Sequence, residues 1–287
     1  MAESPAISGR WSRLGILAGG GDLPRLIAEA EAERSPLVVE LTGFVDREFP
    51  EFETAQFSVG QIGAICKALK AGGCDAVCFA GYIQRPDIKT LKLDARGMIM
   101  VPKALAAGRK GDDALLRVVV GEFETQGFKV VGANEVLESL TPDAAAGFNS
   151  QSVPEHQHDV VKACAVAREI GRLDIGQGAV VADGLVLAVE AQEGTNQMLE
   201  RVAGLRAEVR GTPQARRGVL AKMPKPIQER RIDLPTMGVE TIERASAAGL
   251  AGIALQEGAA LIVNRDAVEA ALREHDMFLA IVEPEDE

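Results

Sequence analysis

The segment KMPKPIQERRIDLPTMG, residues 222–238, holds the densest group of side chains that could do chemistry. Two acids, Glu229 and Asp233, lie among cations, and three prolines restrict the backbone. A solvated loop gains little from a fixed path, whereas a site needs its charges in place before a substrate arrives. We therefore predict a preorganised, charged site here. Its cations are Lys222, Lys225, Arg230, Arg231 and, further away in sequence, Arg217.

A second pair of acids lies in residues 108–117, GRKGDDALLR. Arg109 and Lys110 precede Asp112 and Asp113, which begin an apolar, helix-like stretch. One acid is enough to cap a helix N-terminus. Two acids beside two cations also suit a site that holds a phosphate and Mg²⁺ together. The spacing leaves both interpretations open.

A third motif, EAQEGTN at residues 190–196, joins a predicted strand to a predicted helix. Gly194 allows the backbone to approach a ligand, and Thr195 can cap the helix or bind. Glu190 and Glu193 add oxygens of the kind that metals bind. The alternative is an acid-rich loop with a threonine cap.

A glycine turn, LAGGGDLP at residues 17–24, runs from a predicted strand into a predicted helix. Backbone N–H groups at such a turn can face a phosphate. Aligned on the dinucleotide pattern G-x-G-x-x-G, however, the third glycine position holds Pro24, and Thr42 ends the next strand where a ribose-binding acid is expected. Nicotinamide binding is therefore disfavoured, and a tight turn without a ligand is the simpler alternative.

The elements that must position these motifs fall into two halves. In the first half, strands at 14–17, 37–41, 76–80 and 129–132 alternate with helices at 24–34, 60–71 and 112–126, with a short apolar run at 97–101. Such alternation predicts a parallel sheet in a Rossmann-like domain.

In the second half, helices are predicted at 160–170, 196–210, 239–248 and 266–274. Strands are predicted at 179–182, 185–190 and 219–223, with short ones near Ile253 and Leu261. We predict an N-terminal domain at 1–140, a polar linker at 141–154 and a C-terminal catalytic α/β (α+β) domain at 155–287.

Length and charge limit the possible functions. A chain of 287 residues with 47% hydrophobic and 25% charged residues is typical of a soluble two-domain α/β protein. The net charge of -11 and the lack of a long basic run disfavour nucleic acid, and the charge opposes anionic surfaces. A phosphate site must then depend on local cations, helix N-termini or a metal. Without a signal peptide or an 18-residue apolar stretch, we expect a cytoplasmic protein.

Seven motifs, in the same order and spacing, resemble the LpxI family, and the likeness spans all but about the first dozen residues. They are LAGGGDLP, GYIQRPD, KGDDALLR, GFKVVGA, LDIGQGAVV, LAVEAQEGTN and KPIQERRIDLPTMG. The resemblance implies Mg²⁺-dependent hydrolysis of UDP-2,3-diacylglucosamine to UMP and lipid X in lipid A biosynthesis. It also implies attack of water on the phosphorus next to the sugar.

Because pyrophosphate hydrolysis needs charge neutralisation and an oriented water, we assign hypothetical roles to individual residues. Asp233 is central, as metal ligand or as general base, and Lys225, Arg230 and Arg231 are phosphate cations. Further metal candidates are Asp112, Asp113 and Glu193. The predicted substrate-binding residues are Gly20, Gly21, Asp22, Lys110, Gly194, Thr195, Asn196 and Gln228.

Two positions depart from the family pattern, in which an aspartate often occupies the positions of Glu229 and Asn196. Glutamate keeps the charge, but Asn196 offers only a neutral oxygen. The acyl chains of the implied substrate call for an apolar groove and for transient contact with the inner face of the inner membrane. A homodimer is compatible with this. The rival predictions are a non-catalytic sugar-nucleotide-binding regulator and a dinucleotide-dependent oxidoreductase.

Overall fold

The computed structural model describes residues 11–83, 91–109, 111–226 and 229–284. The chain forms two compact units. Unit 1 comprises Met1–Leu137 together with Glu229–Ile232, and unit 2 comprises Glu138–Gln228 and Asp233–Glu287. Four residues of the predicted site segment therefore belong to unit 1, and the chain returns to unit 2 at Asp233. The predicted domain limits stay a prediction.

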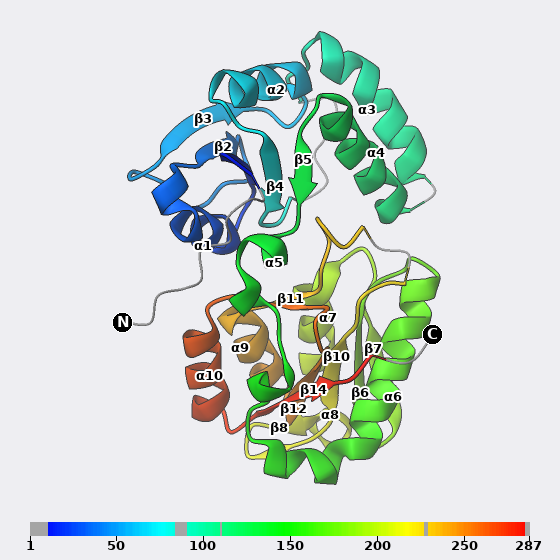
Figure 1. The fold of residues 1–287 in the computed structure, drawn as a ribbon. Coiled ribbons are helices and arrows are strands. Elements are labelled where there is room, and N and C mark those ends of the chain that lie inside the picture. The colour runs from blue at the N-terminus through cyan, green and yellow to red at the C-terminus, as the bar shows by residue number, and fades with distance from the viewer. Residues whose placement is uncertain (1–10, 84–90, 110, 227–228, 285–287) are drawn as a thin grey trace. The chain divides into compact units, whose positions relative to one another are not determined.

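Unit 1 is built on a five-stranded sheet in the order β3-β2-β1-β4-β5, with every pair parallel (Figure 1). This confirms the predicted parallel, Rossmann-like arrangement. The strands are β1 (Leu14–Ala18), β2 (Leu37–Leu41), β3 (Glu53–Phe57), β4 (Ala76–Ala80) and β5 (Lys129–Val131). The helices are α1 (Leu23–Ala30), α2 (Ile62–Ala71), α3 (Ala95–Gly108), α4 (Asp112–Thr125) and α5 (Ala133–Val136), with the 3₁₀ helix η1 at Ala32–Arg34.

The central strands of unit 1 are apolar on both faces because helices cover both faces of the sheet. Leu17 of β1 packs in one cluster with Leu69 of α2 and Phe123 of α4, while its neighbour Ile16 is fully buried on the opposite face. A Cβ on Gly15 would lie 2.2 Å from Leu69 Cδ2, so glycine is what lets α2 pack this closely.

Three elements of unit 1 had no predicted type: β3, α3 and the four-residue α5. The strand β3 is a sheet edge whose side chains are half-buried or exposed, so it lacks the apolar signal of a buried strand. The apolar run at 97–101 lies inside the helix α3, which continues through Pro102. The pattern of apolar residues therefore did not predict the type of an edge strand or of a surface helix.

Unit 2 contains a mixed sheet in the order β14-β12-β10-β6-β7, which confirms a second α/β (α+β) domain. β10, β12 and β14 run parallel, whereas β6 is antiparallel to β10 and to β7. The strands are β6 (Gly178–Ala182), β7 (Leu185–Val189), β10 (Val219–Lys222), β12 (Gly252–Gln256) and β14 (Phe278–Val282). Two small pairs add β8 (Gly211–Thr212) with β9 (Ala215–Arg216) and β11 (Thr236–Met237) with β13 (Leu261–Ile262).

The helices of unit 2 are α6 (Val153–Arg172), α7 (Gly194–Ala203), α8 (Ala207–Arg210), α9 (Val239–Ala247) and α10 (Arg265–Glu274). The predicted hairpin around Asp183-Gly184 is confirmed by β6 and β7. The single helix predicted at 196–210 is wrong, because α7 ends before Gly204 and the short α8 follows. The strand β14 was not predicted.

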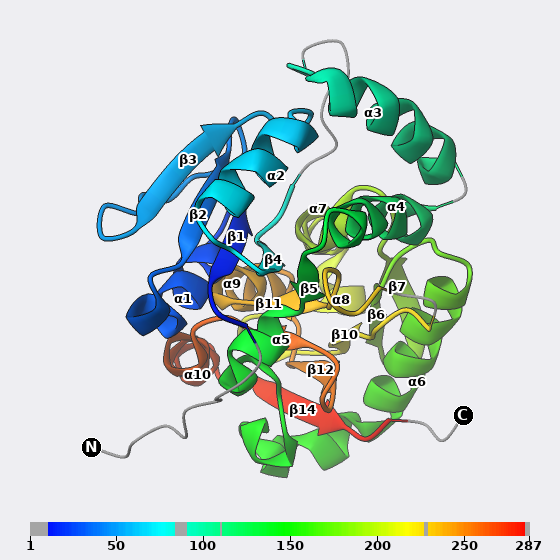
Figure 2. The ribbon, with the colours of Figure 1, turned by 45° about the horizontal axis from the view of Figure 1, so that its top comes forward.

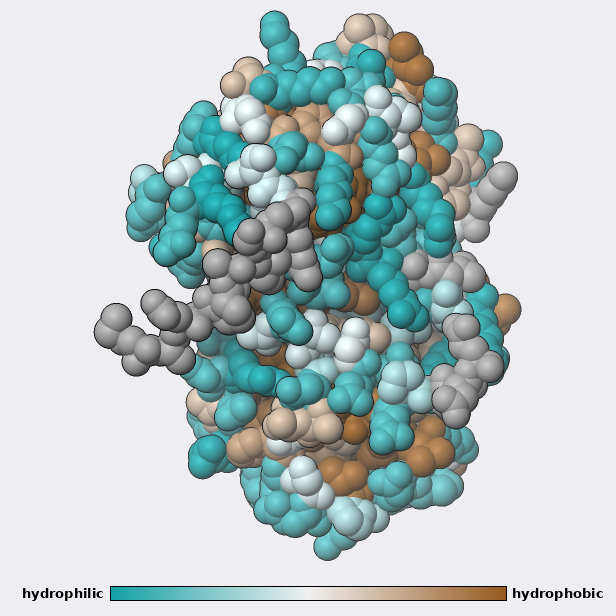
Figure 3. Space-filling view, viewed as in Figure 1, coloured by the Kyte–Doolittle hydropathy of each residue, from teal (hydrophilic) through white to brown (hydrophobic). Residues whose placement is uncertain are grey.

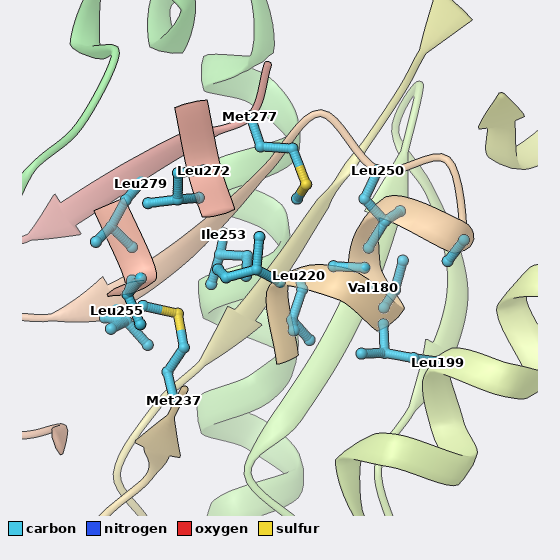
Figure 4. Close-up of a cluster of buried hydrophobic side chains, with 14 of the residues drawn as sticks. Val180, Leu199, Leu220, Met237, Leu250, Ile253, Leu255, Leu272, Met277 and Leu279 are labelled. Atoms are coloured by element: carbon cyan, nitrogen blue, oxygen red, sulfur yellow. The ribbon is translucent and has the colours of Figure 1, made fainter. Parts of the chain in front are cut away.

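Strand residues of unit 2 alternate between two cores. Leu220, Val180 and Ile253 belong to a cluster that includes residues of α7, α9 and α10 (Figure 4). Their sequence neighbours, such as Ala221 and Ala254, pack instead with residues of α6. The small residues on that face allow the 20-residue α6 to lie close to the sheet.

Residues 141–154, predicted as a linker, contain the 3₁₀ helices η4 (Ala144–Ala146) and η5 (Ser150–Ser152) and the start of α6, after η3 (Glu138–Leu140). Phe148 exchanges backbone hydrogen bonds of 2.9 and 3.0 Å with Leu279 of β14. This segment therefore packs on the edge of the unit 2 sheet. In the described part of the chain, no helix has the length and apolar character needed to cross a bilayer.

Replacing Leu220 with alanine should cost about 2–5 kcal/mol of unfolding free energy, because Leu220 is fully buried and the change leaves a cavity. Leu185→Ala is the matched control, since Leu185 is 61% exposed, and should cost roughly 0.5 kcal/mol or less. Urea unfolding followed by circular dichroism measures both. Fluorescence of the single tryptophan, Trp11 in unit 1, provides a reference signal. Equal losses in the two variants would contradict this account of the core.

Candidate functional site

The glycine turn after β1 is closed by residues of unit 1 itself. The Gly20 N–H donates to the Tyr82 carbonyl at 2.9 Å, and the Gly21 N–H donates to Asp46 Oδ1 at 2.9 Å. The Tyr82 hydroxyl donates to Asp46 Oδ2 at 3.0 Å. Gly21 has φ of +87°, a conformation that favours glycine, whereas a Cβ on Gly20 would lie 2.5 Å from the Tyr82 ring and would have to displace that ring.

Asp46 is therefore held where an anionic ligand would meet the turn. The hydrogen bond from Gly21, aided by Tyr82, holds the pKa of Asp46 below its usual value. A carboxylate with a depressed pKa stabilises the fold above its unfolded pKa, and the effect is lost as pH falls through the lower folded value. The predicted ligands Gly20 and Gly21 thus lie in a turn that an internal anion already contacts.

The remaining residues predicted to bind substrate with this turn and its neighbours differ in their surroundings. Asp22 is exposed and pairs with Arg47 at 2.6 Å. Lys110 and Gln228 lie outside the described residues. Sequence reasoning missed Asp46 and Tyr82, because nothing in residues 42–50 or 81–83 indicates that the two would meet at the glycine turn.

The two acids of α4 have separate surroundings, although they are adjacent in sequence. Asp113 is 7% exposed and accepts hydrogen bonds from Arg117 Nε at 2.7 Å and from the Glu229 N–H at 2.7 Å. Asp112 is the first residue of the helix and is half-buried. Asp113 thus fixes the four-residue segment Glu229–Ile232 on α4.

The segment Glu229–Ile232 is held in unit 1 by charge and by apolar packing. Arg231 binds both carboxylate oxygens of Glu229, at 2.8 and 2.9 Å, and also Glu124 at 2.6 Å. These bonds raise the pKa of Arg231 and lower that of Glu229. Ile232 packs against the unit 1 core. Arg230, by contrast, is exposed.

In unit 2, charged side chains gather where β10 ends. Gly178 of β6 pairs with Lys222, and the Glu190 N–H donates to the Gly178 carbonyl at 2.8 Å. A Cβ on Gly178 would lie 2.6 Å from Glu190 Oε2, so the missing side chain leaves room for the carboxylate. Gly178 therefore lies between Lys222 on one neighbouring strand and Glu190 on its other side, and it has no side chain to keep them apart.

Both of these side chains are buried, with Lys222 5% and Glu190 6% exposed. Lys222 Nζ donates to the Thr236 carbonyl at 2.6 Å. Burial lowers the pKa of Lys222, while the negative charges of Glu190 and Asp233 oppose that change. The predicted central residue, Asp233, therefore shares one electrostatic environment with Lys222 and Glu190.

The other residues predicted in unit 2 surround this edge of the sheet. Thr195, in the first turn of α7, donates its hydroxyl to Glu190 Oε1 at 2.9 Å. Asn196 Nδ2 donates to Glu240 at 2.9 Å. Gly194, with φ of +78°, begins α7, and Glu193 pairs with Arg201.

Lys225, predicted as a phosphate cation, forms an ion pair of 2.7 Å with Asp174, and both side chains are nearly buried. Asp174 has φ of +53° and lies in the turn between α6 and β6. This pair fixes the proline-containing loop after β10 to the adjacent turn.

The described residues offer few protein ligands for a metal ion. No group of three or more histidine, cysteine, aspartate or glutamate side chains comes together among the described residues. Mg²⁺ commonly uses one or two carboxylates, with water and substrate phosphate completing its shell. Glu190 Oε2 is buried and has no hydrogen-bond partner within the described structure. A buried carboxylate oxygen without a hydrogen-bond partner fits a cation, and Asp233 is the second carboxylate acting on the same lysine.

Cysteine chemistry is disfavoured in unit 1. Cys66, Cys74 and Cys78 are buried, and burial raises the pKa of Cys66 and Cys74 to about 11 and that of Cys78 to about 12. Since the thiolate is the reactive form, these groups are inert at neutral pH.

Replacing Asp46 with alanine should speed amide hydrogen exchange at Gly21 by about tenfold or more, because a hydrogen bond to a charged acceptor contributes about 1.5–3 kcal/mol. Exchange measured by NMR tests this. Asp143→Ala, at an exposed acid of unit 2, is the control and should leave Gly21 unchanged. Unaltered exchange at Gly21 in Asp46→Ala would refute the hydrogen bond between Gly21 and Asp46.

Comparison with known proteins covers both units. Residues 13–140 match the family model described as the LpxI N-terminal domain, and residues 145–280 match the LpxI C-terminal domain. The chain is 52% identical over 276 residues to UDP-2,3-diacylglucosamine pyrophosphatase LpxI of Caulobacter vibrioides, covering 96% of this chain and 99% of that protein. With both domain models matched in order and the likeness extending over nearly the full length of each protein, the chain belongs to the LpxI family.

Proposed function

We propose that this protein is a UDP-2,3-diacylglucosamine pyrophosphatase, which hydrolyses the pyrophosphate bond to give UMP and 2,3-diacylglucosamine 1-phosphate (lipid X) in lipid A biosynthesis. The observation that carries the proposal is the 52% identity, over nearly the full length of both chains, to a pyrophosphatase that acts on this substrate. The buried Glu190 and Lys222, with Asp233 acting on the same lysine, support it, because they place ionisable groups in an otherwise apolar region.

Hydrolysis of a pyrophosphate requires an oriented water and stabilisation of charge on the phosphate oxygens. In the proposed mechanism, Asp233 lies at the centre. Asp233 and Glu190, the two carboxylates whose charge acts on the buried Lys222, would bind a cation or orient a water molecule. Thr195, through its bond to Glu190 Oε1, fixes the orientation of that carboxylate. Water attacks the phosphorus next to the sugar, so the new oxygen leaves in lipid X.

Mg²⁺ is proposed as the cofactor, with Asp233 and Glu190 as the residues that would hold it. When bound, Mg²⁺ supplies positive charge to the phosphate oxygens as the bond to the leaving group breaks. The orphaned Glu190 Oε2 supports this choice. Asp112, Asp113 and Glu193 stay predictions as ligands, and Asp113 already accepts two hydrogen bonds within unit 1.

The cations have different tasks in this proposal. Lys225 is engaged with Asp174, so its first role is to hold the loop that leads from β10 towards Asp233. Arg231 is anchored by Glu229 and Glu124. Arg230 is exposed and carries a charge that a phosphate can approach. Gly194, Thr195 and Asn196 supply backbone and side-chain contacts to the substrate from the start of α7.

The rival functions are weaker. An oxidoreductase needs the glycine turn to accept a dinucleotide phosphate, whereas the Gly21 N–H donates to Asp46. A sugar-nucleotide-binding regulator would bind the substrate without converting it.

We also propose transient contact with the inner face of the inner membrane, because the acyl chains of the substrate lie in a bilayer.

Changing Asp233 to asparagine should lower kcat by about 10²-fold or more, since the carboxylate charge is lost while the shape is kept. Phosphorus NMR with UDP-2,3-diacylglucosamine and Mg²⁺ in ¹⁸O-enriched water should show the label in lipid X. Asp143→Asn, at an exposed acid of unit 2, is the control and should keep full activity. Label in UMP would disprove the point of attack, and binding without turnover by the wild-type protein would favour the regulator.

Removing divalent cations with EDTA should abolish turnover, and added Mg²⁺ should restore it. Glu190→Gln should raise the Mg²⁺ concentration needed for half-maximal rate by about tenfold or more, a range typical of lost metal-site contacts. Mn²⁺ binding followed by electron paramagnetic resonance should weaken in parallel. Glu208→Gln is the matched control, because Glu208 is an exposed glutamate of α8 in unit 2. Equal effects in the two variants would count against Glu190 as a ligand.

A further inference from the structure

The helix α3 presents an apolar face to solvent. Met98 and Ile99 are each 61% exposed, and Leu105 is 41% exposed. Ala95, Pro102 and Ala106 are exposed on the same stripe, at the i, i+3, i+4 and i+7 spacing of one helix face. Figure 3 shows hydrophobic residues at the surface over α3, next to hydrophilic ones. A surface helix ordinarily directs such a stripe to the core.

The opposite face of α3 already packs against the rest of unit 1, so the exposed stripe is not the face that α3 turns to the core. Gly97 and Met100 are buried, and the helix packs on α4 and α2. A Cβ on Gly97 would lie 1.9 Å from the Gly60 carbonyl oxygen, which fixes that face inward. Figures 1 and 2 both show α3 at the outer edge of unit 1.

The charge around this stripe is opposite to that of the protein. Residues 91–109 carry the cations Lys92, Arg96, Lys103 and Arg109 and the single acid Asp94, whereas the whole chain has a net charge of -11. Arg96 pairs with Glu122, and Asp94 accepts from the Ala64 and Gly97 N–H groups. Lys92 and Lys103 are exposed and have no ion pair with any described residue.

We propose that the exposed face of α3, defined by Met98, Ile99, Lys103 and Leu105, docks on an anionic lipid surface. Apolar side chains flanked by lysine enter the headgroup region while the cations meet lipid phosphates. A second copy is a poorer occupant, because a two-fold contact on this face would set its cations against themselves. The inference rests on the proposed function for its purpose, since it brings the enzyme to a diacylated substrate.

The test is co-sedimentation of the full-length protein, without substrate, with vesicles of phosphatidylglycerol and phosphatidylcholine. Ile99→Gln should weaken binding by about fivefold or more through lost apolar burial. Val161→Gln is the matched control, because Val161 is 59% exposed and lies within α6 of unit 2. Lys103→Glu should weaken binding by about fivefold or more, with Arg206→Glu, an exposed cation of unit 2, as the control of equal charge change.

Three outcomes would overturn the proposal: no binding to anionic vesicles, equal binding to pure phosphatidylcholine, or equal loss in the control variants. Concentration-dependent dimerisation that Ile99→Gln abolishes, without vesicle binding, would assign the face to a second copy instead. Turnover of detergent-solubilised substrate is measured separately. If it persists in Ile99→Gln while vesicle binding falls, docking and catalysis are both upheld as distinct properties. Vesicle binding by a protein without turnover would leave docking intact and reject the proposed function.

Discussion

A buried positive charge at the end of an apolar strand is the constraint around which unit 2 is arranged. Lys222 follows three fully buried residues of β10 and is itself almost inaccessible, so its charge must be compensated within the protein. The Thr236 carbonyl and the carboxylates of Glu190 and Asp233 provide this compensation. Gly178 makes it possible, because any side chain there would occupy the space of the Glu190 carboxylate. The positions of Thr236 and Gly178 therefore matter because they allow the charge of Lys222 to be neutralised.

Carboxylates also hold backbone segments in unit 1, one of them exposed and one buried. The N–H groups of the glycine turn donate to Asp46 and Tyr82, and the buried acid Asp113 accepts from Arg117 and from the Glu229 backbone. The second interaction fixes Glu229–Ile232 in unit 1, immediately before Asp233 in unit 2. The residues of the predicted site segment are therefore divided between the two compact units along the chain.

Charge is distributed unevenly over the protein, and for binding an anionic group the local charge matters more than the net charge. The overall net charge of -11 would oppose an anionic substrate and an anionic surface alike. Local cations oppose this effect at two places, Arg230 and the helix α3. Arg230 is exposed, whereas Lys225 and Arg231 on either side of it are paired with carboxylates. The exposed Lys103 lies in α3, and the exposed Lys92 lies shortly before it.

The sequence by itself determined the parallel sheet of unit 1, most strands of unit 2, the family and the segment around Asp233, because these depend on local apolar periodicity and on contiguous motifs. It did not determine the edge strand β3, the type of the run at 97–101 or the break between α7 and α8, where exposure hides the periodic signal. Tertiary structure alone decided that Asp46 meets Gly21, that Asp113 holds Glu229 and that Glu190 reaches over Gly178 towards Lys222. Each of these contacts joins residues far apart in the chain, and only the packing of strands and helices sets their distance.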